Sequence, residues 1–259
     1  MSKAKILIGY LWKERIKSFQ RLTCNNLSST VKMAKFYKID GSPPARAVMM
    51  LTDILKIPYE EVIVNPFLRE QDTPELTKKN PMRTIPLWEE DNFNLADSHA
   101  IMLYLFDKHA KPEHCYLYPE DRKKRAIINQ RLFFDCGILF PRLRSIMAGT
   151  YTGRMTEISK STIRNVEDSY RILEAYLSEN LYLADDVATL ADLSVMTTMS
   201  SLHGLIPIDQ NRFPKLMQWY NTMKEKDYCK RVNEPGAIEH VMGLKRFMEH
   251  NKENVKAKL

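Results

Sequence analysis

Apolar and polar positions between residues 35 and 109 follow a period that switches between two and about 3.6. Segments with a period of two predict strands, and segments with the longer period predict amphipathic helices. The predicted strands are 35–39, 59–64, 84–90 and 93–96. The predicted helices are 44–57, 73–80 and 97–109. The order β-α-β-α-β-β-α predicts a small α/β domain, which we place at residues 33–113.

Strand patterns end after residues 112–119, PEHCYLYP, which have the composition of a linker. Helical periodicity follows at 122–149, 160–180, 189–205 and 213–226, and again from Ala237. Pro141 is expected to bend the first of these helices. The helix at 189–205 is mostly apolar, which places it at the centre of an all-α bundle over residues 120–250.

The net charge of +7 is concentrated in the first 32 residues. They hold seven basic residues and one acidic residue, which leaves only +1 for the others, so we expect no nucleic-acid partner. Residues 1–32 are interpreted as a basic extension, either disordered or used for targeting. A mitochondrial presequence stays open, as does an upstream start codon before a folded body that begins at Met33.

The sequence contains neither a membrane-spanning apolar run nor a cysteine motif typical of a metal site. No apolar run approaches the roughly 18 residues that span a bilayer, so we expect a soluble, cytoplasmic protein without a membrane partner. The cysteines are Cys24, Cys115, Cys136 and Cys229, without CxxC or CxC spacing. We therefore expect reduced thiols, no disulfide framework and no metal.

Residues 36–48, FYKIDGSPPARAV, place Ser42 between a predicted strand and a predicted helix. Backbone N–H groups at a helix start favour negative charge, and Pro43 and Pro44 stiffen the turn. A serine hydroxyl at this point can donate a hydrogen bond to a thiolate and lower the pKa of the thiol from about 8.5 toward neutrality. The alternative is a plain helix cap.

Two further motifs suit a peptide ligand. In Thr84-Ile85-Pro86, a cis Ile85–Pro86 bond would expose the backbone of Ile85 to an extended peptide. Asp97 and Ser98 begin a helix, where Ser98 and nearby N–H groups can bind a carboxylate and Asp97 can accept from an ammonium. The alternatives are an edge-strand proline and an ordinary cap.

Four motifs, SPP-x-RAV, NP-x-x-TIP, DSHAIMLYL and LADLS, occur in an order and spacing that resemble cytosolic glutathione transferases. The likeness covers Lys35 to about His250, and FFDCGILFPRLR is more similar to the insect epsilon class than to the delta class. It implies a thioredoxin-like, glutathione-binding α/β domain, then an all-α helical-bundle domain that forms most of a hydrophobic substrate site, in a homodimer. It also implies that Ser42 stabilises the glutathione thiolate.

The resemblance further implies that the backbone of Ile85 pairs with the cysteinyl unit, and that Asp97 and Ser98 hold the γ-glutamyl end. The full expected glutathione-binding set is Gln71, Arg83, Thr84, Ile85, Asp97, Ser98 and His99. Two members depart from the epsilon pattern, which usually has one histidine where Arg83 stands and another near Gln71. A guanidinium can bind a carboxylate at least as well, but Arg83 also brings bulk and fixed charge near the thiolate.

The long helix is expected to face the second substrate. Phe140, Leu143, Arg144 and Met147 are spaced by three and four, which puts them on one helix face. The alternative is that this face is core, except at Arg144, since a charged residue in an apolar stripe requires an anion or water. Thr189 and Asp192 have capping-box spacing and predict a structural helix start.

The resemblance implies an enzyme, a glutathione transferase that adds glutathione, its co-substrate, to hydrophobic electrophiles, with detoxification of xenobiotics as the default role. One alternative is a non-catalytic binding protein (a ligandin), which the departures at Gln71 and Arg83 keep open. The other is a steroid-linked epsilon-type member in ecdysteroid biosynthesis. Such members tend to carry an acidic residue where Leu143 stands, which weighs against that role.

Overall fold

The computed structural model describes residues 33–256. The expectations for the basic segment 1–32 and for Cys24 lie outside these residues. The first part of the described chain is built on a four-stranded mixed sheet with the order β2-β1-β3-β4. The strands are β1 (Lys35–Lys38), β2 (Glu60–Ile63), β3 (Leu87–Glu90) and β4 (Phe93–Ala96). β1 pairs parallel with β2 and antiparallel with β3, and β3 pairs antiparallel with β4.

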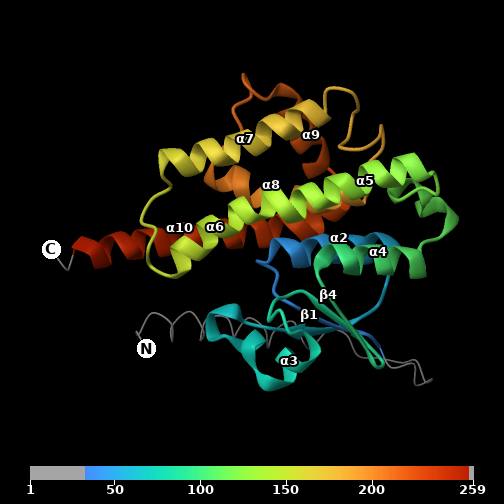
Figure 1. The fold of residues 1–259 in the computed structure, drawn as a ribbon, viewed down its shortest axis with the longest axis horizontal. Helices are drawn as coiled ribbons and strands as arrows, with labels where there is room; N and C mark the ends of the chain where they lie inside the picture. The colour runs from blue at the N-terminus through green and yellow to red at the C-terminus, as the bar shows by residue number, and fades with distance from the viewer. Residues whose placement is uncertain (1–32, 257–259) are drawn as a thin grey trace. The chain divides into compact units, whose positions relative to one another are not determined.

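Different helices cover the two faces of this sheet (Figure 1). Helices α2 (Pro43–Leu55) and α4 (Ser98–His109) lie on one face, where Phe36 joins the main hydrophobic core. Helix α3 (Pro74–Lys79) lies on the other face, where Tyr37 belongs to a smaller cluster. Neighbouring residues of β1 thus point to opposite faces, as the period of two requires. The thioredoxin-like α/β arrangement predicted from the sequence is confirmed.

The predicted order of elements is correct, and most boundaries differ by one or two residues. The largest difference in this part of the chain is at the strand predicted over 84–90, which begins only at Leu87. Pro86 immediately precedes that strand, and a proline has no N–H to donate to a neighbouring strand.

The second part of the described chain is helical, as predicted. Its helices are α5 (Arg122–Phe134), α6 (Phe140–Tyr151), α7 (Lys160–Tyr176), α8 (Leu190–Leu205), α9 (Pro214–Lys224) and α10 (Glu234–Lys256). Shorter segments are the π-helical turns Asp135–Leu139 and Cys229–Asn233 and the 3₁₀ turns Pro66–Leu68, Glu70–Asp72 and Pro112–Leu117. Within residues 33–256, no helix is both long enough and apolar enough to cross a membrane.

The helix predicted over 122–149 is interrupted before Pro141, where the bend was expected. The interruption is the π-helical turn Asp135–Leu139, in which the N–H of Phe140 donates to the carbonyl of Asp135. Pro141 lacks an N–H and its ring crowds the preceding turn, so the irregular segment lies on the N-terminal side of the proline. The turn buries Asp135 and leaves Cys136 exposed.

Helix α8 has the central position that its apolar sequence predicts. Every residue from 190 to 202 is buried. The carboxylate of Asp192 accepts hydrogen bonds from both the N–H (2.8 Å) and the hydroxyl (2.9 Å) of Thr189, from the N–H of Leu183 (3.0 Å) and from the indole of Trp219 (2.9 Å). Burial raises the pKa of Asp192, and these four bonds oppose that rise. The capping box predicted from Thr189 and Asp192 is confirmed.

The sheet domain contacts the helical domain through α2, which packs against α8 and α10. Arg46 of α2 is fully buried there. Its Nε donates to Asn233 Oδ1 (2.9 Å), and its Nη2 donates to the carbonyl of Thr197 (3.0 Å) and to Ser201 Oγ (3.1 Å). These bonds hold the start of α2 in a fixed position relative to the helical domain.

Candidate active site

Ser42 lies at the turn between β1 and α2 and caps the helix. Its backbone is extended, and its Oγ accepts a long hydrogen bond of 3.4 Å from the N–H of Ala45. Its own N–H donates to the carbonyl of Ile39 (3.0 Å), which closes the turn. The hydroxyl is an acceptor in its helix-capping bond and therefore keeps its proton for donation to a second group. Both the cap and the anion-binding role predicted for Ser42 are compatible with this geometry.

The turn that carries Ser42 is supported from two elements. Nη1 of Arg46 donates to the carbonyls of Gly41 (2.9 Å) and Asp40 (3.3 Å). Gly236, at the start of α10, lies so close that a Cβ there would be 2.2 Å from the Asp40 carbonyl oxygen. A side chain at position 236 would therefore displace either α10 or the turn.

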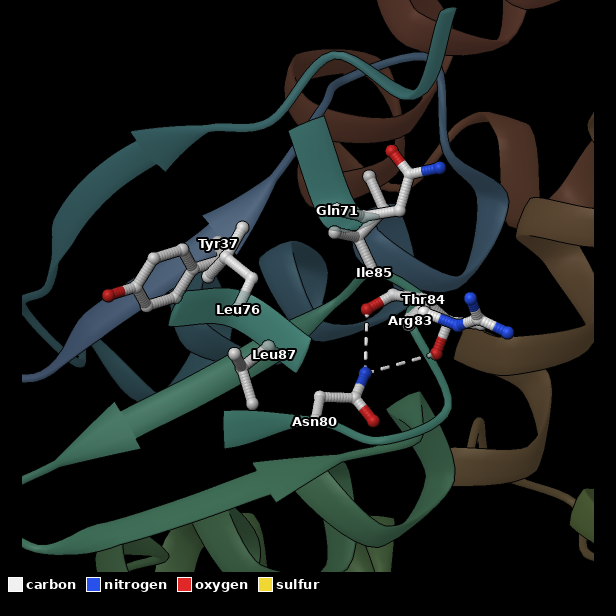
Figure 2. A pocket seen from close by; sticks show the side chains of 8 residues that line it. All are labelled: Tyr37, Gln71, Leu76, Asn80, Arg83, Thr84, Ile85 and Leu87. Atoms are coloured by element: carbon white, nitrogen blue, oxygen red, sulfur yellow. Dashed lines mark hydrogen bonds between the residues drawn. The ribbon is translucent and has the colours of Figure 1, made fainter. Parts of the chain in front are cut away.

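The loop between α3 and β3 forms a small hollow (Figure 2). Gln71, Arg83, Thr84 and Ile85 of the expected glutathione-binding set all line it. The Ile85–Pro86 bond is cis, and the loop is held by Asn80, whose Nδ2 donates to the carbonyl (2.8 Å) and the hydroxyl (3.2 Å) of Thr84. The buried Oε1 of Gln71 has no hydrogen-bond partner among the described residues. Arg83 is exposed.

The second part of the expected set lies at the start of α4. Asp97 Oδ1 accepts from the N–H groups of His99 (2.9 Å) and Ala100 (3.2 Å), so Asp97 is the helix cap. Its side chain remains 43% exposed, which leaves it available to a ligand. Ser98 is only 4% exposed, so its contribution to a carboxylate site depends on its N–H more than on its side chain.

His99 joins α4 to the helical domain through a network that the sequence analysis missed. Its Nδ1 lies 3.2 Å from Asp97 Oδ1, and its Nε2 lies 3.2 Å from Asp135 Oδ2. Ser194, from the LADLS segment of α8, donates to the same Asp135 oxygen at 2.5 Å and lies 3.0 Å from His99 Nε2. The only sequence signal was a carboxylate within the apolar run FFDCGILF, since Ser194 is one of several hydroxyl residues in α8.

The network makes His99 a cation at neutral pH. Burial of the imidazole opposes its charge, but the hydrogen bonds to Asp135 and Asp97 outweigh burial and raise the pKa of His99 to about 9. The hydrogen bond from His99 in turn lowers the pKa of Asp97, against the effect of its own burial. The start of α4 therefore presents a fixed carboxylate beside a fixed positive charge.

The helix face expected to meet the second substrate is only partly available. Phe140 and Met147 are half-buried at the edge of the core, and Arg144 is exposed. Leu143 is 0% exposed and belongs to the core, so its expected place in the substrate site is corrected. A spacing of three and four selects one helix face but does not show where the neighbouring helices cover it.

The chain shows clear similarity to characterised proteins. Residues 36–113 match the family model of the glutathione S-transferase N-terminal domain, and residues 155–227 match that of the C-terminal domain. Glutathione S-transferase 1 of Manduca sexta is 41% identical over 77% of this chain and 92% of its own length. An epsilon-class glutathione S-transferase from the housefly, Musca domestica, has a TM-score of 0.79 and 39% identity, covering 83% of this chain and 98% of that one. A glutathione transferase homologue from Drosophila mojavensis, solved with bound glutathione, has a TM-score of 0.78 and 37% identity, covering 83% and 97%.

Proposed function

The chain belongs to the glutathione S-transferase family, and we propose that Ser42 is the residue with which it activates glutathione for conjugation to hydrophobic electrophiles. The observation that carries this assignment is the Ser42 hydroxyl at the start of α2, in a turn fixed by Arg46 and α10. A hydroxyl that can donate beside a helix start is the arrangement that stabilises a thiolate.

In the proposed reaction, the thiol of glutathione loses its proton to water and the thiolate accepts a hydrogen bond from Ser42. The thiolate then forms a carbon–sulfur bond to the electrophile. In a substitution the leaving group departs with its electron pair, and in an addition the π bond of the electrophile opens and the resulting anion takes a proton from water. Ser42 forms no covalent bond to substrate and needs no base, because its role is to favour the charged form of the thiol.

The rest of the peptide is proposed to bind along the loop before β3 and at the start of α4. The backbone of Ile85 would pair with the cysteinyl unit, while Asp97, Ser98 and His99 hold the γ-glutamyl end. Asp97 would accept from the α-ammonium, and the cationic His99 keeps that carboxylate ionised and oriented. Gln71, Arg83 and Thr84 would receive the glycine end, where the exposed guanidinium of Arg83 favours the terminal carboxylate.

The second substrate is proposed to lie against Phe140, Arg144 and Met147. Detoxification, a cytoplasmic location and a homodimer are proposed on the strength of the family resemblance. The domain boundaries 33–113 and 120–250 are likewise proposals. A steroid-linked role is less favoured, because the residue at the position where those members carry an acid is here the fully buried Leu143.

A spectrophotometric conjugation assay with glutathione and a chlorinated nitroaromatic tests the proposal. We expect saturable turnover above the uncatalysed rate, together with glutathione binding measured by calorimetry. Glutathione binding without turnover on any of several electrophiles would favour the ligandin alternative. Absence of both would contradict the proposed site as a whole.

A further inference from the structure

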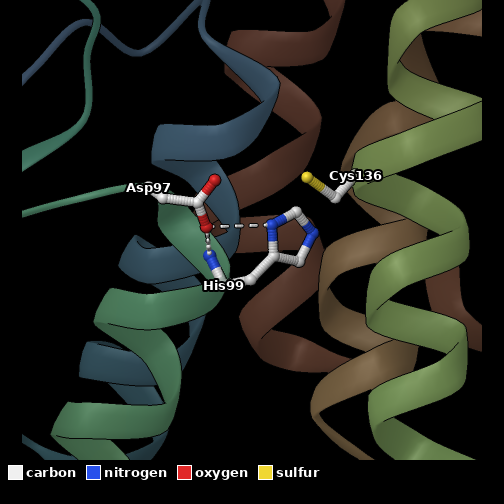
Figure 3. A group of neighbouring side chains, drawn as sticks. All are labelled: Asp97, His99 and Cys136. Atoms are coloured by element: carbon white, nitrogen blue, oxygen red, sulfur yellow. Dashed lines mark hydrogen bonds and ion pairs between the residues drawn. The ribbon is translucent and has the colours of Figure 1, made fainter. Parts of the chain in front are cut away.

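We propose that Asp97, His99 and Cys136 form a binding site for a thiophilic divalent cation such as Zn²⁺. One ligand atom from each residue lies within 4.8 Å of the other two. In Figure 3 the sulfur of Cys136 faces the His99 ring and the Asp97 carboxylate. The three residues come from two elements, the start of α4 and the π-helical turn Asp135–Leu139, so that the fold and not a sequence motif brings them together.

The distance between the histidine and aspartate ligand atoms matches that of a zinc site. Zinc binds nitrogen and oxygen ligands at about 2.0–2.1 Å and thiolate sulfur at about 2.3 Å, usually as a tetrahedron. His99 Nδ1 and Asp97 Oδ1 lie 3.2 Å apart. With zinc bound to both atoms, the N–Zn–O angle would therefore be about 100°, close to the tetrahedral value. Cys136 is exposed, and its sulfur is directed toward this pair.

Asp135 gives His99 the outer support that metal-binding histidines have. A histidine that binds a metal through one ring nitrogen almost always donates the N–H of the other to a carboxylate or carbonyl. His99 faces Asp97 with Nδ1, while its Nε2 lies 3.2 Å from Asp135 Oδ2. Ser194 donates to the same oxygen and fixes it (2.5 Å). This carboxylate–histidine arrangement sets the ring orientation that a metal at Nδ1 requires.

The carboxylates near the site favour a cation once the proton of His99 Nδ1 has been displaced. Two carboxylates, those of Asp97 and Asp135, face one imidazole. The second oxygen of Asp135 is buried and has no hydrogen-bond partner among the described residues.

When zinc binds, the protons of the Cys136 thiol and of His99 Nδ1 pass to solvent. One coordination position remains open to water because Asp97 and Cys136 both lie at the surface. A sulfur, nitrogen and oxygen set of this kind selects zinc-like ions over Mg²⁺ or Ca²⁺.

The consequence for activity rests on the proposed function. Asp97 and His99 are also the residues proposed to hold the γ-glutamyl end of glutathione. Zinc and glutathione should then exclude each other, and zinc should act as a competitive inhibitor with respect to glutathione.

Direct binding to the full chain tests the site without reference to activity. Zn²⁺ is titrated in competition with a chromogenic chelator, and Co²⁺ is added separately to detect sulfur-to-cobalt charge-transfer absorption. We expect one equivalent to bind with an affinity at least about tenfold weaker in Cys136→Ser, and about 10–100-fold weaker in Asp135→Asn. Cys115→Ser, which removes another exposed thiol, is the matched control and should bind as the parent does.

Equal zinc affinity of the parent and Cys136→Ser, or a cobalt complex without sulfur-to-cobalt absorption, would overturn the site. Because Cys136 is exposed, the serine variant is expected to fold even if the Asp135 variant does not. Competition is tested with S-methylglutathione, whose blocked thiol does not sequester zinc. A rise in the apparent zinc Kd supports a shared site. An unchanged zinc Kd would overturn both the competition and the assignment of Asp97 and His99 to glutathione. The zinc site itself is tested separately, by the zinc affinity of Cys136→Ser.

Discussion

Arg83 places a permanent positive charge in the loop where epsilon-type relatives are expected to have a histidine. The residue is exposed and lines the hollow beside Ile85. If it holds the glycine carboxylate of glutathione, affinity should be nearly constant between about pH 5.5 and 8, since a guanidinium stays protonated throughout. A histidine at the same place would titrate within that window.

We therefore expect Arg83→Ala to weaken glutathione binding by about 1–3 kcal/mol, and Arg83→His to introduce a pH dependence. Calorimetric titration with glutathione measures both effects. Lys78→Ala removes another exposed positive charge, on α3, and is the matched control for a general loss of charge. If Arg83→Ala binds glutathione within about twofold of the parent, the side chain points away from the peptide and its assignment is wrong.

Single residues were predictable where their position follows from local sequence. Ser42 and Asp97 were expected at helix starts, and both are found there because short polar side chains satisfy free N–H groups. The contact of His99 with Asp135 and Ser194 was not predictable. Those residues are 36 and 95 positions away in the chain, and no local pattern encodes which side chains meet after folding.

At the scale of elements, the contact between α10 and the turn that carries Ser42 has a direct test. Gly236→Ala would place a methyl group 2.2 Å from the Asp40 carbonyl oxygen. We expect this variant to lose about 1–3 kcal/mol of unfolding free energy, because overpacking forces the backbone to move. Its turnover should fall as well, since the turn positions Ser42. Urea unfolding and the conjugation assay measure the two effects.

Gly243→Ala is the matched control on the same helix. A Cβ at Gly243 meets nothing within 4 Å, so the variant should be neutral or more stable by about 0.5–1 kcal/mol. If Gly236→Ala behaves like Gly243→Ala in both measurements, α10 does not support the turn.

The type and order of the elements were predicted well. The prediction was less accurate where a proline changes the structure of the turn that precedes it. The bend expected at Pro141 is instead a π-helical turn that ends at Leu139. The hydrogen bonds that a proline removes belong to the preceding turn, and the identity of the residue alone does not say how that turn rearranges. This one rearrangement determines that Asp135 is buried and Cys136 exposed.

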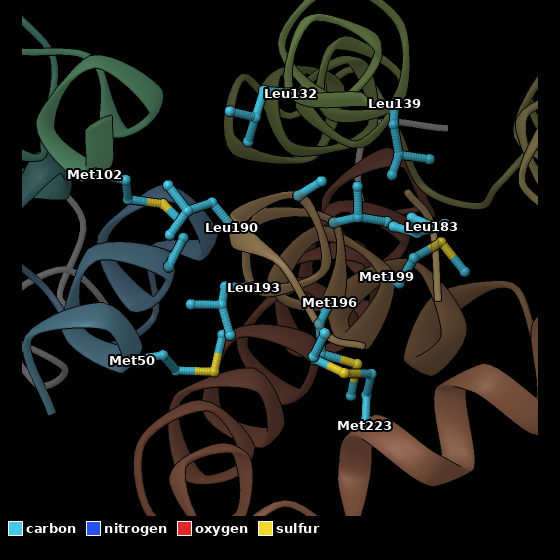
Figure 4. Packing of buried hydrophobic residues seen from close by; sticks show 14 of the residues in the cluster. Met50, Met102, Leu132, Leu139, Leu183, Leu190, Leu193, Met196, Met199 and Met223 are labelled. Atoms are coloured by element: carbon cyan, nitrogen blue, oxygen red, sulfur yellow. The ribbon is translucent and has the colours of Figure 1, made fainter. Parts of the chain in front are cut away.

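At the scale of the whole molecule, the two predicted domains share one core. Met50 of α2 and Met102 of α4 belong to the same hydrophobic cluster as Leu193 and Met196 of α8 (Figure 4). The sequence predicted which residues are apolar in each domain. It did not predict that these surfaces would merge, because packing between domains depends on geometry that has no period in the sequence.

His240 should make the stability of this shared core sensitive to acid. The residue is buried on α10, its Nδ1 lies 2.9 Å from Ser201 Oγ, and its Nε2 has no hydrogen-bond partner among the described residues. Burial, with a smaller contribution from the charge of Arg46, lowers the pKa of His240 to about 3. The unfolded chain therefore takes up a proton below about pH 6.5 that the folded chain excludes, so stability is present above that pH and is lost as the pH falls.

Between about pH 6.5 and 4.5, His240 should account for a loss of about 2 kcal/mol of unfolding free energy. His240→Gln should reduce that pH dependence, while the exposed His250→Gln should leave it unchanged. Urea unfolding at fixed protein concentration gives the free energies. The same slope in the parent and in His240→Gln would show that other groups cause the acid sensitivity.

The pKa of bound glutathione, followed by the ultraviolet absorption of its thiolate, tests the central assignment to Ser42 most directly. Ser42→Ala removes one hydrogen bond to a charged group, worth about 1.5–3 kcal/mol, so the pKa of the bound thiol should rise by about one to two. Turnover should fall about 10–100-fold with glutathione affinity nearly unchanged, and Ser42→Thr, which keeps the hydroxyl, should retain most of the effect. An unchanged thiol pKa and unchanged turnover in a folded Ser42→Ala protein would contradict the account.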